Sequence, residues 1–222
     1  MPARPVLDRS HEAIRDDLLR LTSMVDSAIV RSLRALVERD CDLARQVSID
    51  DSSLNVIRYA LEDRAYTMIA TQQPTGQDLR AIVAAVSVAT NLERMGDHAA
   101  GIARLTLRLC EQPLIKPLVD LPHMADIARY MMRGAVDAYL QRNVILAEQV
   151  VAQDVQINRL HSQIYRELLT YMTRDPSTIE QATFLLWISH SVERIGDRSK
   201  NICERAIYVA TGELKELNHD TQ

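Results

Sequence analysis

The sequence contains few aromatic residues and glycines, and this scarcity limits the fold classes open to it. Aromatic residues make up 4% of the 222 residues, and there are only 6 glycines and 7 prolines. Alanine, leucine, valine, isoleucine, glutamate, glutamine and arginine dominate instead, and these residues favour helices over twisted sheets. We therefore expect an all-α protein, built either as one large domain or as two domains of about a hundred residues each.

Basic patches and long apolar runs are also missing. The 26 basic residues are scattered among 30 acidic ones, giving a formal charge of −4, and this disfavours direct nucleic-acid binding. The longest uncharged apolar windows hold about a dozen residues, short of the roughly 18 to 20 that a membrane-spanning helix needs. The N-terminal sequence carries no secretion signal, so the expected location is the cytoplasm.

The three cysteines form no CxxC pair and are odd in number. Cys41, Cys110 and Cys203 therefore indicate neither a disulfide framework nor a thiolate zinc site. We interpret all three as small apolar residues of the core.

Apolar residues recur with a helical period in six segments, which make the same three-helix pattern twice. The segments are residues 8–38, 43–72, 78–111, 122–141, 146–173 and 178–211. Pro113, Pro117 and Pro122 separate the third segment from the fourth, because proline does not continue a helix. We expect two domains, residues 8–112 and 118–212, each an antiparallel three-helix bundle with short loops.

The two halves also resemble each other residue by residue, which is the signature of an internal repeat. Residues 39–58 align with residues 142–161 at a constant offset of 103, and the third helices of the two halves align at an offset of 100. The matching pairs include Asp51/Asp154, Asn55/Asn158, Glu93/Glu193, Gly96/Gly196 and Asp97/Asp197. The sequence therefore predicts two tandem three-helix bundles, with six helices in all.

Acidic side chains recur at equivalent helical positions in both halves. On a helical wheel, Glu93 and Asp97 lie one turn apart on the most apolar face of their helix, so their carboxylates point towards neighbouring helices. The other oxygen-bearing pairs at this spacing are Glu193 with Asp197, Asp51 with Asn55, and Asp154 with Asn158. Like charges one turn apart destabilise a helix, and half-buried carboxylates cost more unless something compensates their charge.

A metal ion is one such compensator. Two carboxylates from one helix, with an aspartate and an amide from another, form an all-oxygen site that suits Mg²⁺, Mn²⁺ or Ca²⁺ and also admits iron. Gly96 and Gly196 fit this arrangement, because each costs its helix about 1 kcal/mol relative to alanine but lets a partner helix approach closely. We interpret the nearby His98, His161 and His190 as hydrogen-bonding neighbours rather than as ligands.

Ion pairing is the simpler interpretation of any single pair of acids. The acids repeat between the halves, however, whereas their candidate cationic partners do not: Arg104 is matched by Glu204, and Lys200 by Ala100. A salt-bridge explanation would have to differ between the halves, whereas a bound ion or a shared partner surface would be the same in both. The repeat therefore favours a common ligand.

Three stretches of the chain resemble the repeated motifs of a known family. "ERMGDHAAGIA", "ERIGDRSKNICE" and "QPTGQDLR" are similar to motifs of the PhoU family of regulators associated with bacterial phosphate uptake, including its actinobacterial PhoY members. The likeness extends from about residue 8 to Gly212 and includes both motif copies in the expected halves. The resemblance implies two three-helix bundles packed side by side, often as a homodimer.

The resemblance also implies metal ions held on the bundle surface by paired acidic motifs. Carried over by position, the ligands are Asp51, Asn55, Glu93 and Asp97 in one half and Asp154, Asn158, Glu193 and Asp197 in the other. The ion is open among Mg, Mn, Fe and Zn. The chain departs from the family pattern at Asn55 and Asn158, where a carboxylate is replaced by an amide. The loss of one negative charge per site argues against multinuclear clusters and for a weakly held ion or none.

The function implied by the resemblance is regulatory rather than enzymatic. Members of the family act in the cytoplasm as negative regulators of phosphate-starvation signalling and phosphate uptake. They link a Pst-type ABC phosphate transporter, through its ATPase, to a sensor histidine kinase, and they meet the membrane only through these partners.

Two other functions stay open at this point. One is a metal-free helical adaptor, whose repeated acids form a docking surface for a basic partner. The other is a di-metal carboxylate oxidase, which would carry Glu-x-x-His on two core helices. The only Glu-x-x-His in this chain is Glu216 to His219, near the C-terminus, so the oxidase is the weakest candidate.

Overall fold

The computed structural model is all-helical over the residues that it describes, which are 4–214, 216 and 217. Its elements, in chain order, are α1 (Arg4–Glu38), α2 (Cys41–Asp50), α3 (Ser52–Gln72), α4 (Gln77–Leu109), α5 (Asp120–Gln141), α6 (Val144–Val151), α7 (Asp154–Arg174), the 3₁₀ turn η1 (Pro176–Thr178) and α8 (Ile179–Thr211). The predicted duplication is confirmed, with α1 to α4 forming the first repeat and α5 to α8 the second.

The second helix of each repeat is divided in two, where the sequence predicted continuous helices over residues 43–72 and 146–173. The break between α2 and α3 falls at Asp51, and the Leu54 amide donates to the Asp51 carbonyl at 3.0 Å. The break between α6 and α7 falls at Ala152 and Gln153, where the Gln153 amide donates to the carbonyl three residues earlier. These hydrogen bonds tighten one turn, so the first divided helix bends at Asp51 and the second bends immediately before Asp154.

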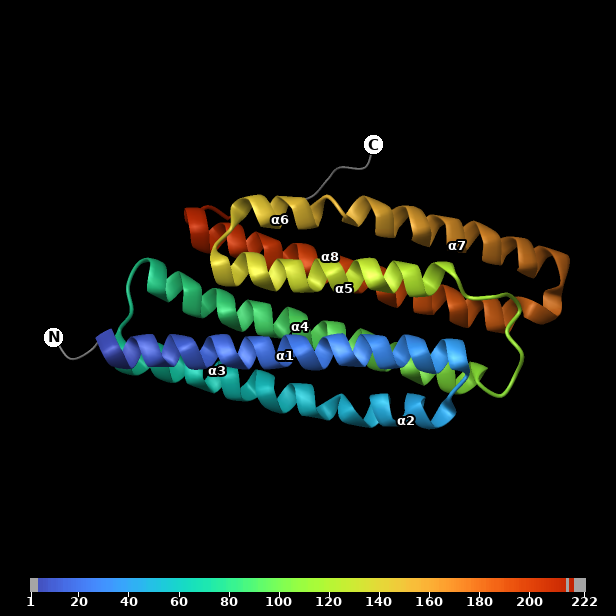
Figure 1. The fold of residues 1–222 in the computed structure, drawn as a ribbon, viewed down its shortest axis with the longest axis horizontal. Helices are drawn as coiled ribbons and strands as arrows, with labels where there is room; N and C mark the ends of the chain where they lie inside the picture. Colours follow the sequence, from blue (N-terminus) through green and yellow to red (C-terminus); the bar gives the residue numbers. More distant parts are fainter. Residues whose placement is uncertain (1–3, 215, 218–222) are drawn as a thin grey trace.

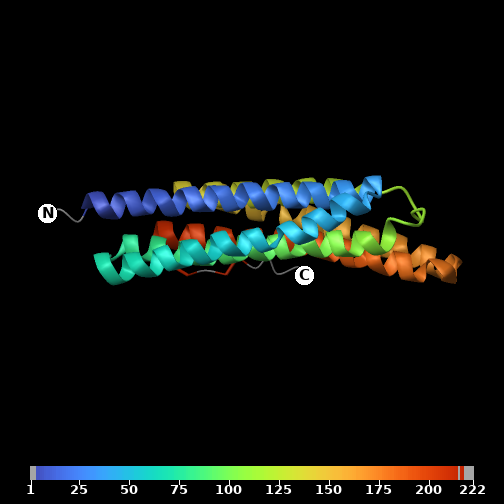
Figure 2. The same ribbon diagram turned by 90° about the horizontal axis from the view of Figure 1, so that it is seen from below.

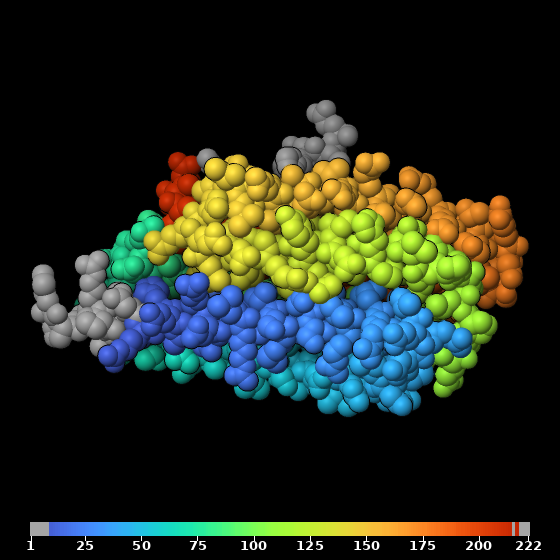
Figure 3. All heavy atoms as spheres, in the orientation of Figure 1, coloured from blue at the N-terminus to red at the C-terminus, as the bar shows by residue number. Residues whose placement is uncertain are grey.

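The helices run in alternating directions along the long axis of an elongated molecule, when each divided helix is counted as one (Figure 1). α1 and α5 pack side by side, and α4 and α8 pack together as a second layer behind them (Figure 2). The divided helices, α2–α3 and α6–α7, run along opposite edges. Figure 3 shows the face that α1 and α5 cover. The two helices with paired glutamate and aspartate, α4 and α8, therefore lie next to each other.

One continuous apolar core joins the two repeats. Side chains from both repeats, including Leu18, Leu92, Met131 and Ile195, are buried in the same hydrophobic cluster. Polar contacts cross between the repeats as well, since the Tyr139 hydroxyl donates to the Ala81 carbonyl at 2.8 Å. The repeats are thus tandem in sequence but share their interior. The proposed bounds of the two domains, residues 8–112 and 118–212, stay a prediction.

The proline-containing linker between α4 and α5 is held against α8. The Gln181 side chain donates to the Pro113 carbonyl at 3.0 Å and accepts a hydrogen bond from the Ile115 amide. At the far end of α8, Gly212 adopts φ = 82° and closes the helix, as its position in the sequence predicts. None of the described helices is both long enough and apolar enough to cross a membrane.

A disulfide joins Cys41 and Cys110, which corrects the interpretation of these residues as unpaired core side chains. Their Cα atoms lie 5.8 Å apart although 69 positions separate them in the sequence. The bond ties the start of α2 to the residue that follows α4, and so closes one end of the first repeat. Cys203 is a free thiol buried in the core, as expected.

Candidate functional site in two acidic clusters

The first acidic cluster consists of Asp51, Glu93 and Asp97. The bend between α2 and α3 places Asp51 above α4 at Gly96. A Cβ atom built on Gly96 would lie 3.7 Å from Asp51 Oδ1 and only 2.1 Å from Leu54 Cδ1. The missing side chain of Gly96 therefore lets α3 approach α4 closely, as the sequence predicts, and this approach brings the Asp51 carboxylate towards the acids of α4.

The second acidic cluster consists of Asp154, Glu193 and Asp197, and it is built in the same way. Asp154 begins α7, directly after the bend, and lies above Gly196 of α8. A Cβ atom on Gly196 would lie 3.7 Å from Asp154 Oδ1 and 2.8 Å from Ile157 Cδ1. The duplicated sequence thus produces a duplicated arrangement, with one acid from the edge helix above two acids of the layer behind.

The carboxylates of the first cluster repel one another. Burial, followed by the charge of Asp97, raises the pKa of Glu93, and the same two causes raise the pKa of Asp51. Arg94 lies at the outer side of the cluster, 3.3 Å from Asp97 and 3.7 Å from Glu93. Arg104 offsets only part of the rise in the pKa of Asp51. Negative charge in the first cluster is therefore incompletely compensated.

The second cluster contains a cation of its own. Lys200 Nζ lies 2.8 Å from Asp154 Oδ2 and 2.8 Å from Asp197 Oδ1, so one ammonium group bridges acids from two helices. Asp154 is buried, with 7% of its surface exposed, and Lys200 is half-buried. Ion pairing therefore compensates the aspartates of the second repeat, although the sequence comparison of the two halves favoured a common ligand. The preference for a common ligand rested on the difference at this position, because the first repeat has Ala100 where the second has Lys200.

Two oxygens of the second cluster stay without a hydrogen bond. Asp154 Oδ1 is buried beside Gly196 and has no hydrogen-bond partner. Glu193 Oε2 is also buried without a hydrogen bond, although His190 Nδ1 lies 3.2 Å away. Burial, followed by the charge of Asp197, raises the pKa of Glu193. Lys200 thus compensates the aspartates and leaves Glu193 to the neighbouring His190 and Arg194.

Asn158 supports a carboxylate through its amide nitrogen. Asn158 Nδ2 donates a hydrogen bond of 3.0 Å to Asp154 Oδ2, the oxygen that also accepts from Lys200. Asn55 is half-buried one turn after Asp51 on α3. An amide nitrogen that donates to a carboxylate supports that carboxylate but offers no lone pair to a cation. Asn158 therefore belongs to the hydrogen-bond network of the second cluster.

The histidines near the clusters act as neighbours. His161 Nδ1 lies 2.8 Å from the buried Ser189 hydroxyl. Burial, followed by the charge of Arg198, lowers the pKa of His98. Since Arg198 belongs to α8, this effect shows that the acidic motif of α4 lies within electrostatic range of α8. Among the residues that the structure describes, no group of three or more His, Cys, Asp and Glu side chains is placed so that it could hold a metal ion.

The two clusters differ in their fit to a metal ion. The first cluster offers only carboxylate oxygens, mutually repelling and without an ammonium group between them, which is the donor chemistry of a hard divalent ion. These carboxylates have the donor chemistry for such an ion, but in the described residues they are not placed together so that they could hold one. The second cluster does not fit, because Lys200 takes the position between Asp154 and Asp197 that the ion would need.

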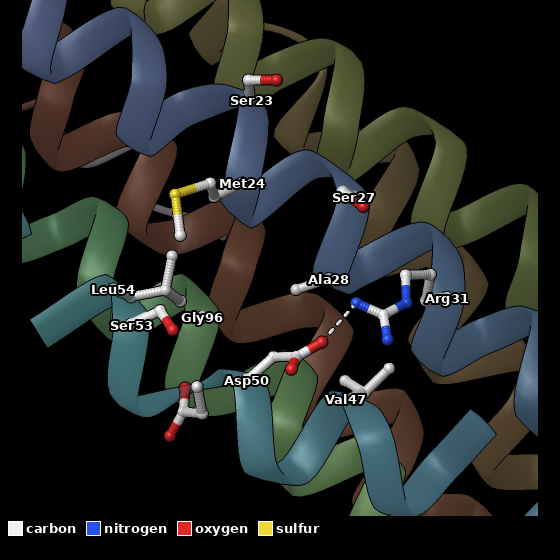
Figure 4. A pocket seen from close by; sticks show the side chains of 11 residues that line it. Ser23, Met24, Ser27, Ala28, Arg31, Val47, Asp50, Ser53, Leu54 and Gly96 are labelled. Carbon is white, nitrogen blue, oxygen red and sulfur yellow. Dashed lines mark hydrogen bonds and ion pairs between the residues drawn. The ribbon is translucent and has the colours of Figure 1, made fainter. Parts of the chain in front are cut away.

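A pocket of about 390 Å³ borders the first cluster, between α1 and the bend of α2–α3 (Figure 4). Asp51 and Gly96 contribute to its lining, and sequence reasoning did not find it. Across the pocket, Arg31 of α1 pairs with Asp50 at the end of α2 at 2.7 Å, as Figure 4 shows. The two residues are far apart in the chain, so no local sequence signal announces the pair.

The Glu-x-x-His motif of a di-metal oxidase gains no support from the fold. Glu216 follows the end of α8, and His219 lies outside the residues that the structure describes. A di-iron site of that kind needs the motif on core helices. The acids of the two clusters lie instead at the junctions of edge helices with α4 and α8.

Known proteins similar to this chain include curated relatives and solved structures. An accessory protein of the phosphate-specific transport system from Clostridium acetobutylicum, a PhoU homologue, is 33% identical over 216 residues, which is 97% of this chain and 99% of the relative. The crystal structure of PhoU from Pseudomonas aeruginosa matches with a TM-score of 0.88 and 31% identity, over 93% of this chain and 99% of that one.

A second crystal structure, of the phosphate transport system regulatory protein PhoU from Streptococcus pneumoniae, also gives a TM-score of 0.88, with 29% identity over 95% of this chain. The sequence model of the PhoU domain matches twice, at residues 18–106 and 121–206. The two matches coincide with the two structural repeats. The chain therefore belongs to the PhoU family, whose members are regulatory accessory proteins and not enzymes.

Proposed function

We propose that this protein is a cytoplasmic negative regulator of phosphate-starvation signalling and phosphate uptake. In this role it links the ATPase of a Pst-type ABC phosphate transporter to a sensor histidine kinase, and it reaches the membrane only through these partners. The observation that carries the proposal is the match over nearly the whole chain to accessory proteins of the phosphate-specific transport system. The protein acts as a homodimer, and it resembles the actinobacterial PhoY members of the family.

The helical surfaces around the two clusters are the contact surfaces in this proposal. A regulator without a catalytic site works by binding, and its binding surface must change with the signal or with the partner. Of the acids at the junctions of α2–α3 with α4 and of α6–α7 with α8, Asp51, Asp97, Glu193 and Asp197 are partly exposed, whereas Glu93 and Asp154 are buried. These properties suit the recognition of a basic partner surface, directly or through an ion.

A divalent ion binds at the first cluster in this proposal, with Asp51, Glu93 and Asp97 as its ligands and Asn55 as a neutral oxygen donor. When bound, the ion supplies positive charge that relieves the repulsion among these carboxylates. The chain's own residues hold the helices in place: Gly96 keeps α3 close to α4, and Arg94 screens the outer side. Mg²⁺ and Mn²⁺ are the ions that fit oxygen ligands best, ahead of iron and zinc.

A metal-free adaptor is the second candidate, and a specific contact favours it. Lys200 already neutralises part of the second cluster, so that half of the protein needs no ion to stay folded. Metal analysis of protein purified without chelator separates the candidates. The variant for comparison combines Glu93→Ala, Asp97→Ala, Glu193→Ala and Asp197→Ala, and identical near-zero metal in variant and wild type would refute ion binding.

Deletion of the gene tests the regulatory role. We expect phosphate-starvation genes, read by a transcriptional reporter, to be expressed in high phosphate when the gene is deleted, and to be repressed again when the wild-type gene is restored. Continued repression in the deletion strain, with any second copy of the gene also removed, would contradict the proposal.

A matched pair of complementing variants then asks whether the acids carry the function. We expect a gene with Asp51→Asn, Glu93→Gln and Asp97→Asn to restore repression poorly, and a gene with the exposed-site change Asp63→Asn to restore it fully. A pull-down from cells grown in high phosphate identifies the partner, with recovery of the transporter ATPase or the kinase as the expected result.

A further inference from the structure

We propose that Lys200 is a built-in cation that takes the place of a bound ion in the second repeat, so that divalent ion binding is confined to the first repeat. The statement about the first repeat rests on the proposed function, whereas the role of Lys200 stands on its own contacts. The inference makes the two repeats unequal: one cluster responds to ions, and the other is permanently closed.

The position of Lys200 is the first support. It lies on α8, one turn after Gly196, and its ammonium group is 2.8 Å from Asp154 of α7 and 2.8 Å from Asp197 of its own helix. It therefore bridges the same two helices that an ion would bridge. Asn158 completes the arrangement by donating to Asp154 at 3.0 Å. Asp154 Oδ2 thus receives two donors, one of them charged, whereas Oδ1 has no hydrogen-bond partner.

The equivalent position of the first repeat is the second support. Position 100 is a buried alanine, with 1% of its surface exposed, and it can supply no charge to Asp51 or Asp97. Arg104, the next cation on α4, is exposed to solvent, and no hydrogen bond links it to Asp51 among the described contacts. The first cluster consequently has the acids of the second without its internal cation.

The two clusters also differ in access, and the first cluster is again the more open one. In the first repeat, Arg31 and Val47 line the open pocket that reaches Asp51. The equivalent residues of the second repeat are Gly134 and Val150, and a Cβ atom on Gly134 would lie 2.6 Å from the Val150 side chain. α5 and α6 are therefore in close contact where α1 and α2 leave a pocket. An ion and its water shell have more room at the first cluster than at the second.

Manganese binding to the full-length protein tests the proposal, with free Mn²⁺ followed by electron paramagnetic resonance. We expect wild-type protein to bind one Mn²⁺ per chain. Asp97→Asn should weaken this binding by at least about tenfold, because the ion loses a charged ligand, whereas Asp197→Asn should leave it unchanged. Loss of the wild-type site in Asp197→Asn with retention in Asp97→Asn would overturn the proposal.

Two further variants, one in each repeat, change the charge at the equivalent positions 100 and 200. Lys200→Met keeps an unbranched side chain of nearly the same length and removes its charge, and we expect it to bind a second Mn²⁺ that disappears again when Asp197→Asn is added. Ala100→Lys places the ammonium group in the first repeat, and we expect it to abolish the wild-type site. Unchanged stoichiometry in Lys200→Met, in protein whose wild-type site is intact, would overturn the inference.

Thermal unfolding in the presence of EDTA separates the failure of this inference from the failure of the proposed ion. We expect Lys200→Met to unfold at a lower temperature than wild type, and the added change Asp154→Asn to recover part of the loss. If no variant binds Mn²⁺ but this pattern holds, the ion of the proposed function fails and the role of Lys200 stands. If Lys200→Met unfolds at the wild-type temperature, Lys200 does not neutralise the cluster, and the inference is refuted.

Discussion

In the first repeat the residue one turn after Gly96 of α4 is Ala100, whereas in the second repeat the equivalent residue of α8, one turn after Gly196, is Lys200. Around these two positions the backbone and the acids are the same: an aspartate at a helix bend, a close approach at a glycine, and a glutamate and an aspartate on the helix below. One side chain decides whether the acids repel one another or are bridged. A duplicated motif therefore does not imply a duplicated ligand.

The repeats also differ at the ends of their helices. Asp40 and Asn143 cap α2 and α6 in the same manner, each accepting a hydrogen bond from the amide three residues later. Next to these caps, the first repeat has the disulfide between Cys41 and Cys110, whereas the second has Val144 and Ala210 at the equivalent positions. The first repeat is thus cross-linked at its end and open at its acidic cluster, and the second repeat is the reverse.

Removal of the disulfide should have the largest effect on stability. We expect the double variant Cys41→Ala, Cys110→Ala to lose about 2–4 kcal/mol of unfolding free energy relative to the oxidised wild type, because the cross-link no longer restricts the unfolded chain. Urea unfolding with and without a reductant measures the loss. The reductant should destabilise the wild type and leave the double variant unchanged. Equal stability of oxidised and reduced wild type would contradict this expectation.

The second-largest effect on stability should come from replacing an aspartate by asparagine at equivalent positions of the two repeats, because the two replacements should have different costs. Asp154→Asn removes the acceptor of Lys200 and should cost about 1–2 kcal/mol, since it breaks a charge-assisted hydrogen bond in a buried place. Asp51→Asn removes a charge that its surroundings disfavour, so in metal-free protein it should be neutral or slightly stabilising. Urea unfolding in EDTA measures both. Equal losses in the two variants would mean that the clusters are electrostatically alike.

Alanine at the glycines of α4 should give a smaller difference. Gly96→Ala brings a methyl group against Leu54, which is buried, and we expect a net loss of about 1 kcal/mol after the gain in helix propensity. Gly101→Ala meets only the end of Arg104, at 3.8 Å, so it should gain about 0.5–1 kcal/mol from propensity alone. If both variants gain stability in thermal unfolding, the close approach of α3 and α4 is not tight.

The smallest expected effect is a dependence on pH. The folded pKa values of Glu93 and Glu193 lie above their unfolded values, mainly because of burial and then because of the neighbouring aspartates. The folded protein therefore binds more protons than the unfolded chain in the pH range just above the ordinary carboxyl pKa values. These two groups destabilise the metal-free protein at neutral pH, and this penalty is relieved as the pH falls through their raised pKa values.

Glu93→Gln is the variant that tests this pH dependence. Unfolding free energies measured in EDTA between pH 7 and the carboxyl range should show a smaller gain on acidification in Glu93→Gln than in wild type. Lys200 affects stability in a different pH range. Its pKa is raised in the folded protein, so its contribution to the free energy of unfolding is complete below the ordinary lysine pKa and is lost only as the pH rises through the raised pKa. An identical pH profile in the variant and the wild type would show that Glu93 titrates normally.

The repeat, the helical class and the reason for the two helix glycines could be predicted from the sequence, because each depends on local period or on a comparison of the two halves. The bends at Asp51 and at Gln153 could not, since no proline or glycine marks them and they arise from single tightened turns. The pairing of Cys41 with Cys110 depends on how α2 lies against α4, which spacing alone does not give.

The bridge made by Lys200 is the most instructive of the missed contacts. Lys200 and Asp154 are 46 positions apart, and they meet only because α7 lies across α8 at Gly196. The comparison of the halves correctly identified position 200 as different from position 100. It could not show that Lys200 pairs with Asp154, because the charge of a side chain is visible in a sequence whereas its partner on another helix is not.

The most direct test is a crystal structure of the protein soaked in MnCl₂, with anomalous scattering recorded to locate the metal. We predict an anomalous peak beside Asp51, Glu93 and Asp97, and none beside Asp154, Glu193 and Asp197, where the Lys200 ammonium group should stay between the two aspartates. A peak at the second cluster, with Lys200 displaced into solvent, would contradict the unequal roles of the two repeats.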